Sequence, residues 1–129
     1  MGLSDYRYGG TIPVEDMASA KEFYEGKLGL SGGEEVSDGG ITYSCAEGST
    51  VHVFPSPGNA GKTAATLGGW NVEDIDSVVT ELSSNGVTFE QVHQGPIETD
   101  EKGIATLGDS RIAWFKDPDG NTLALFQPE

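Results

Sequence analysis

The feature that most constrains the fold of this chain is an internal repeat. The run Val14-Glu15-Asp16-Met17 returns near the middle of the sequence as Val72-Glu73-Asp74-Ile75. In each copy an extended segment leads in and a helical pattern follows. The repeat therefore predicts two matched units, each made of a strand, a helix and further strands.

Both copies carry the signals of a helix N-terminus. Asp16 and Asp74 are suited to the N-cap position, and apolar residues follow each of them at helical spacing. We expect the first helix to end at Gly29 and the second at Asn85-Gly86. The buried stripes should be Met17, Ala20, Phe23, Tyr24 and Leu28 in the first helix, and Ile75, Val78, Val79 and Leu82 in the second.

Short strand-like runs separated by turn signals follow each helix. In the first unit they cover about 31–37, 40–46 and 49–55, and in the second about 87–93, 111–116 and 121–127. The turn at Asp117–Gly120 connects the last two runs, with Pro118 at its second position. The polar stretch 95–110 is predicted to be a long loop, which is either a lid or a mobile acidic excursion.

The length of 129 residues fits a single domain. We divide it into a first module over about 5–55, a linker over about 56–63 and a second module over about 64–129. The linker contains most of the run PSPGNAG at 55–61, which is rich in turn-forming residues. The predicted class is α+β.

Charge and composition exclude several functions. The chain has 21 acidic and 7 basic residues, a net charge of −14, so we expect no nucleic acid and no anionic membrane as partner. No apolar run approaches the roughly 20 residues of a membrane helix, and the N-terminus lacks the pattern of a signal peptide. The single cysteine, Cys45, cannot form an internal disulfide, which favours a cytoplasmic location.

Strand alternation divides the side chains into two faces. Aliphatic sides such as Val51 and Val53, or Leu123 and Leu125, should pack beneath the helices. For Trp70 we favour the same core position over the alternative, contact with a ligand. The mixed sides should face a shared concavity that binds a ligand. Trp114 and Phe115 are adjacent and so point to opposite faces, and we choose Trp114 for the concavity. The predicted ligand-binding residues are Arg7, Thr11, His52, Phe54, Trp114 and Phe126.

The beginning and the end of the chain carry motifs that resemble those of a known protein family. The opening VEDMASAKEFYEGKLGL and the closing WFKDPDGNTLALFQP resemble the vicinal oxygen chelate superfamily. It includes glyoxalase I, extradiol dioxygenases, and fosfomycin- and bleomycin-resistance proteins. The resemblance implies paired βαβββ modules whose mixed sheet curls into a cup, with the helices outside. It also implies a homodimer with the site in the cup or at the subunit interface.

The resemblance further implies four positions for a divalent metal, one on each of four strands. Carried across by motif, they are Gly9, His52, Leu67 and Ala124. Only His52 offers a donor atom, whereas a metal site of this type needs at least three nitrogen or oxygen ligands. We therefore expect no metal and no cofactor.

Three hypotheses of function follow. The first is a protein that binds a small aromatic or amphipathic molecule, as bleomycin-resistance proteins bind their antibiotic. The second is an enzyme of the same superfamily, a lyase, isomerase or dioxygenase, which uses an unconventional metal set or a metal-free site around His52. The third is an accessory module whose cup is closed by side chains. No catalytic residue can be assigned from the sequence.

Overall fold

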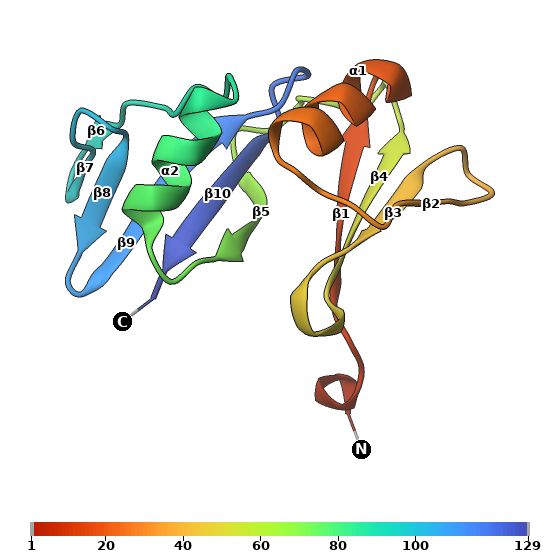
Figure 1. Cartoon of the computed structure of the whole chain (residues 1–129), viewed down its shortest axis with the longest axis horizontal. Coiled ribbons are helices and arrows are strands. Elements are labelled where there is room, and N and C mark those ends of the chain that lie inside the picture. The colour runs from red at the N-terminus through yellow and green to blue at the C-terminus, as the bar shows by residue number, and fades with distance from the viewer. Residues whose placement is uncertain (1, 129) are drawn as a thin grey trace.

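The computed structural model describes residues 2–128, and these form two four-stranded sheets with one main helix each (Figure 1). The first module contains β1 (Gly9–Val14), α1 (Met17–Lys21), β2 (Glu34–Glu35), β3 (Ile41–Ser44) and β4 (Thr50–Pro55). The second contains β5 (Thr66–Asn71), α2 (Ile75–Ser84), β8 (Ile104–Leu107), β9 (Ser110–Lys116) and β10 (Thr122–Gln127). A short hairpin of β6 (His93–Gln94) and β7 (Ile97–Glu98) precedes β8.

The two sheets repeat one topology. Their strand orders are β1-β4-β3-β2 and β5-β10-β9-β8. In each sheet the first strand pairs in parallel with the last, and the other pairs are antiparallel. The α+β class and the paired βαβββ modules are thus confirmed. No hydrogen-bonded ladder joins the sheets within residues 2–128, so they stay open instead of curling into one continuous sheet.

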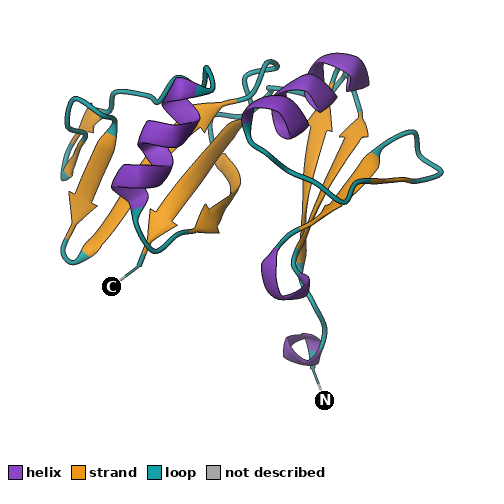
Figure 2. Cartoon of the chain, in the orientation of Figure 1, coloured by secondary structure: helices purple, strands orange, loops and turns teal. Residues whose placement is uncertain are grey.

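Both helices begin where the repeat predicts. The side chain of Asp16 accepts a hydrogen bond from the amide of Ala18 at 3.1 Å, and that of Asp74 accepts one from Ser77 at 3.3 Å. After α1 the chain widens into a π-helical turn, η2 (Glu22–Lys27), before Gly29 ends it with a φ of +79°. Figure 2 shows α2 lying across the sheet of the second module.

The fourth strand of the second module differs from the prediction. We expected a strand at 87–93 and a loop over 95–110, but the strand is β8, inside the predicted loop. Its short apolar run follows a glycine turn, and the two-residue turn Gly108-Asp109 folds it back onto β9. Residue Gly108 has a φ of +63°, which that turn requires. In the segment 87–93, Phe89 makes one isolated bridge to β9.

In the first module the run predicted at 31–37 is a strand only at Glu34–Glu35. Gly32 and Gly33 lie just before it, and glycine weakens a strand because it has no side chain to pack. A Cβ on Gly33 would also come within 2.8 Å of Ile41, so the backbone approaches its neighbour closely there.

One hydrophobic core spans both modules. The helix-facing sides of the two sheets supply it, as predicted for Val53, Leu123 and Leu125. Phe23 of η2 reaches Phe115 of β9, with ring centroids 6.4 Å apart. Other members are Ile12, Val14, Tyr24, Ile41, Tyr43, Ile75, Val79, Leu82, Ile104 and Ala113.

A buried hydrogen-bond network also joins the modules. Tyr24 donates to a carboxylate oxygen of Asp117 at 2.7 Å. The side-chain amide of Asn121 donates to the carbonyl of Pro13 at 2.7 Å and to Asp117 at 2.9 Å. Burial, together with the neighbouring Asp117 carboxylate, raises the pKa of Tyr24 far above its usual value, so the phenol remains a donor.

Within residues 2–128, no helix combines the length and apolar character needed to cross a bilayer.

Replacing Tyr24 with Phe should lower the free energy of unfolding by about 1.5–3 kcal/mol. The substitution removes a buried hydrogen bond to a charged group while it keeps the ring in the core. Urea denaturation followed by circular dichroism measures the change. Tyr8→Phe is the matched control, since Tyr8 is 85% exposed, and it should stay within about 0.5 kcal/mol of the parent. Equal effects of the two variants would contradict the role given to the Tyr24 hydroxyl.

Candidate ligand-binding site

His52 is the centre of a polar group on the first sheet. It lies in β4 on the sheet face away from the core, in register with Thr11 of β1 and Thr42 of β3. Its Nδ1 is 2.9 Å from the hydroxyl of Thr42, and its Nε2 is 2.7 Å from a carboxylate oxygen of Asp38. The ring of Phe54 stacks on the imidazole at 5.6 Å with an angle of 6° between the planes.

These contacts determine the state of the imidazole. An ionised carboxylate only accepts hydrogen bonds, so Nε2 carries a proton and donates a hydrogen bond to Asp38. In the neutral ring Nδ1 then accepts from Thr42, and both nitrogens have a partner. The hydrogen bond from His52, followed by that from the amide of Gly40, holds the pKa of Asp38 below its usual value. The imidazole is therefore fixed in orientation by neighbours on two sides.

Trp114 and Phe126 form an aromatic group on the second sheet. Phe115 is fully buried in the core, so its neighbour Trp114 lies on the opposite face, as we predicted from alternation. Trp114 pairs with Ala124, and Phe126 is two residues further along the same strand. A Cβ on Gly69 would clash with the Ala124 carbonyl oxygen and come within 2.6 Å of the Phe126 ring, so glycine lets β10 and Phe126 approach β5 closely.

The remaining two predicted residues lie near the N-terminus. Thr11 is exposed on β1 beside His52. Arg7 precedes β1 and is also exposed, and it packs on Gly48, where an added Cβ would lie 2.8 Å from its side chain. The structure thus brings Thr11, His52 and Phe54 together on one sheet. Trp114 and Phe126 are together on the other.

Three hollows lie along the two sheets. One of about 220 Å³ lies between the sheets and is bordered by Thr11 and Trp70. A second of about 280 Å³ lies beneath the segment after η2, and a third of about 350 Å³ is bordered by Phe126, Ile112 and Arg111. None of the three contains residues of both groups, so the shared concavity expected from the sequence is not formed by these hollows within residues 2–128.

Sequence reasoning missed Asp38 and Thr42. Asp38 stands in the turn Asp38-Gly39-Gly40, which we treated only as a break between strands. Its contact with His52 depends on the pairing of β3 with β4, and Thr42 faces His52 for the same reason. The alternation of Ile41, Thr42 and Tyr43 could have placed Thr42 on the outer face, but it does not identify the partner strand.

The residues at the four family metal positions do not fit a divalent ion. Gly9, Leu67 and Ala124 offer no donor atom, and His52 is held by Asp38 and Thr42. Among residues 2–128 no group of three or more His, Cys, Asp or Glu side chains could hold a metal. No catalytic step through a bound metal follows from this arrangement.

Comparisons with known proteins agree with the fold. TnmS3, an antibiotic binding protein from Streptomyces sp. CB03234, is 23% identical with a TM-score of 0.71, and the match covers 96% of each chain. The bleomycin resistance determinant encoded on transposon Tn5 is 22% identical with a TM-score of 0.69, over 95% of this chain and 97% of that one. A glyoxalase/bleomycin resistance protein from Catenulispora acidiphila DSM 44928 is 24% identical with a TM-score of 0.68, over 95% and 98%.

A search of curated proteins finds no match. A family model, described as Glyoxalase/Bleomycin resistance protein/Dioxygenase superfamily, matches residues 9–125. That match spans both modules, from β1 to β10, and it confirms the resemblance of the opening and closing motifs. The chain belongs to the Glyoxalase/Bleomycin resistance protein/Dioxygenase superfamily.

Proposed function

We propose that this protein binds a small aromatic or amphipathic molecule and releases it unchanged, as a resistance protein sequesters an antibiotic. The observation that carries the proposal is the state of His52. It is the one family metal position with a donor atom, and both of its nitrogens already have partners in the chain. A side chain held in this way can present its ring and its neighbours to a ligand.

Aromatic and polar side chains of the two groups would make different contacts with the ligand. Phe54, Trp114 and Phe126 supply aromatic surface that can stack on a planar ligand. Arg7 and Thr11 supply polar groups that orient it, while His52, whose nitrogens are held by Asp38 and Thr42, supplies its ring. The net charge of −14 attracts cationic molecules over a long range. The structural likeness to a protein described as antibiotic binding, and to a bleomycin resistance determinant, supports this class of ligand.

A second copy of the chain would complete the site. The two groups lie on separate sheets, so a homodimer can place the first sheet of one copy opposite the second sheet of the other. The N-terminal segment supports this assembly because Leu3 is 88% exposed and Tyr8 is 85% exposed. Tyr6, 63% exposed, lies between them in the sequence, and exposed apolar side chains that form one patch indicate an interaction surface.

The alternative is a metal-free enzyme, and one observation favours it. Asp38, His52 and Thr42 form a chain in which a carboxylate orients an imidazole beside a hydroxyl, as in sites that activate a nucleophile. Formation of a product from any candidate substrate, lost in His52→Ala and in Asp38→Asn, would establish this alternative in place of simple binding.

Elemental analysis should find less than a stoichiometric amount of Zn, Ni, Mn or Fe in the purified protein, and His52→Ala should leave that content unchanged. The reason is the missing donor set at positions 9, 67 and 124. Inductively coupled plasma mass spectrometry gives the measurement. A stoichiometric ion that is lost in His52→Ala would favour the metal-dependent enzyme over the binding protein.

Replacing Trp114 or Phe126 with Ala should weaken the binding of an aromatic antibiotic by about two- to tenfold, the size of an aromatic stacking contribution. Isothermal titration with bleomycin, followed by a panel of planar cationic compounds, measures the affinity. Val36→Ala serves as the control, because Val36 is partly exposed on the turn after β2. If both aromatic variants bind as the parent does, the proposed surface is not the binding site.

Sedimentation should show a dimer at micromolar concentration, and the double variant Leu3→Ser, Tyr8→Ser should shift it toward the monomer. These substitutions remove exposed apolar surface that the core does not use. A parent protein that remains monomeric at all concentrations would argue against a site shared by two copies.

A further inference from the structure

A second apolar hollow lies on the other side of the second sheet from Trp114 and Phe126. It has a volume of about 280 Å³ and lies between α2 and the segment that follows η2. Leu28 and Leu30 border it on the side of that segment, Val78 on the side of α2, and Trp70 and Phe115 on the side of the sheet. No residue of the proposed site borders it.

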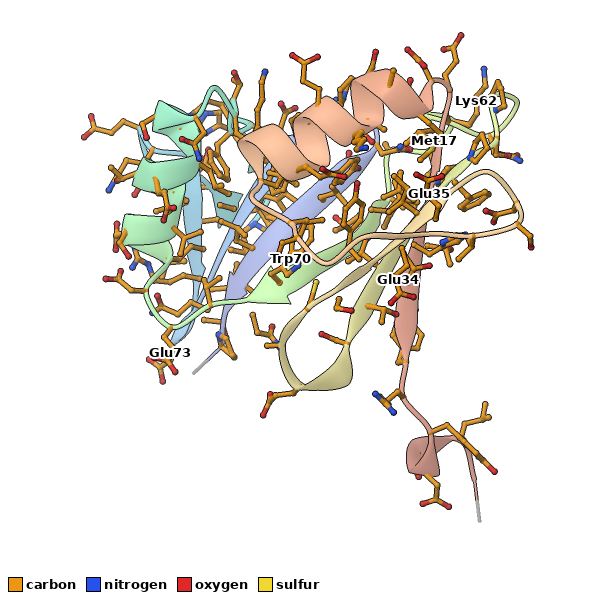
Figure 3. The ribbon with its side chains drawn as sticks, turned by 45° about the vertical axis from the view of Figure 1, so that its right-hand side comes forward. Met17, Glu34, Glu35, Lys62, Trp70 and Glu73 are labelled. Carbon is orange, nitrogen blue, oxygen red and sulfur yellow. The ribbon has the colours of Figure 1, made fainter. Side chains whose placement is uncertain are left out.

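Trp70 lies on β5 (Figure 3). It borders both this hollow and the hollow between the sheets. Its ring lies nearly parallel to that of Phe115, with 15° between the planes and 6.4 Å between the centroids. It is half-buried, and within residues 2–128 its indole N–H has no hydrogen-bond partner. No buried side-chain nitrogen or oxygen in residues 2–128 lacks a hydrogen bond, so this N–H is accessible to solvent or to a ligand.

The rim of the hollow carries a carboxylate without a cation. Glu81 is exposed on α2, and its carboxylate has no hydrogen bond or ion pair within residues 2–128. The chain as a whole carries a net charge of −14. An apolar, aromatic cavity with a free carboxylate at its mouth is complementary to a ligand that has an aromatic body and a positive end.

The volume limits the size of that ligand. An apolar cavity of about 150 Å³ is large enough to bind benzene. At about 280 Å³ the hollow has room for one aromatic ring with a short chain.

We infer that this hollow is a binding site for a small aromatic amine, with the ring against Trp70 and the ammonium group at Glu81. The inference is independent of the proposed function, because it concerns the opposite side of the sheet and different residues.

The two tryptophans of the chain allow a direct test. In ¹⁵N-labelled Trp114→Phe protein the one remaining indole signal belongs to Trp70. In Trp70→Phe protein the remaining signal belongs to Trp114, which confirms the assignment. Titration with 2-phenylethylamine should move the Trp70 signal in a saturable way. Phenylacetate, which has the same ring and the opposite charge, should move it little.

A pair of charge variants tests the ammonium contact. Glu81→Gln should raise the dissociation constant for 2-phenylethylamine about two- to fivefold, as expected for an exposed ion pair. Glu73→Gln removes the same charge from an exposed residue that does not border the hollow, and should leave the constant unchanged.

Four outcomes would overturn the inference. They are the absence of a saturable shift, an equal response to phenylacetate, equal effects of the two charge variants, and a Trp70 signal that depends on protein concentration instead of on the amine. The last would show that a second copy of the chain covers the hollow.

Discussion

The arrangement of the two modules depends on the hydrogen bond between Tyr24 and Asp117. It joins the π-helical turn after α1 to the turn between β9 and β10, which are far apart in the sequence. Asn121 extends the contact to the carbonyl of Pro13 and, through its side-chain oxygen, to the amide of Gly61. Tyr24 belongs to the motif FYEGKLGL, and Asp117 and Asn121 belong to DPDGN. The two motifs that identify the family therefore touch one another, which gives a physical reason for their presence together.

A buried carboxylate destabilises a protein unless its oxygens are satisfied. Asp117 is 5% exposed, and it accepts hydrogen bonds from Tyr24, from the side chain of Asn121 and from the backbone amides of Asp119 and Asn121. The same four donors fix the shape of the turn that leads into β10. The hydrogen bonds that satisfy the Asp117 carboxylate therefore also orient β10, an inner strand of the second sheet. On β10, Leu125 faces the core and Phe126 faces away from it.

The parts of the structure that could be predicted from the sequence depend on local physics. The capping residues Asp16 and Asp74 mark both helices, and alternation places Trp114 and Phe115 on opposite faces. The parts that could not be predicted depend on pairing between distant segments. The strand β8 is four residues long, and only its pairing with β9 distinguishes it from the polar loop around it. In the same way, the contact of His52 with Asp38 follows from the register of β3 and β4, which no local signal determines.

The register of the second sheet sets a small residue beside the aromatic side chains of its outer face. Ala124 lies between Gly69 and Trp114 on neighbouring strands, and it is fully buried. A His or Glu at this position, as the family's metal site would require, would need the space that the Trp114 and Phe126 side chains border. Because core and strand regions tolerate little extra volume, the larger residue would displace the aromatics or distort the sheet. We therefore expect a larger residue at 124 to crowd Trp114 and Phe126, in addition to any donor atom that it would bring.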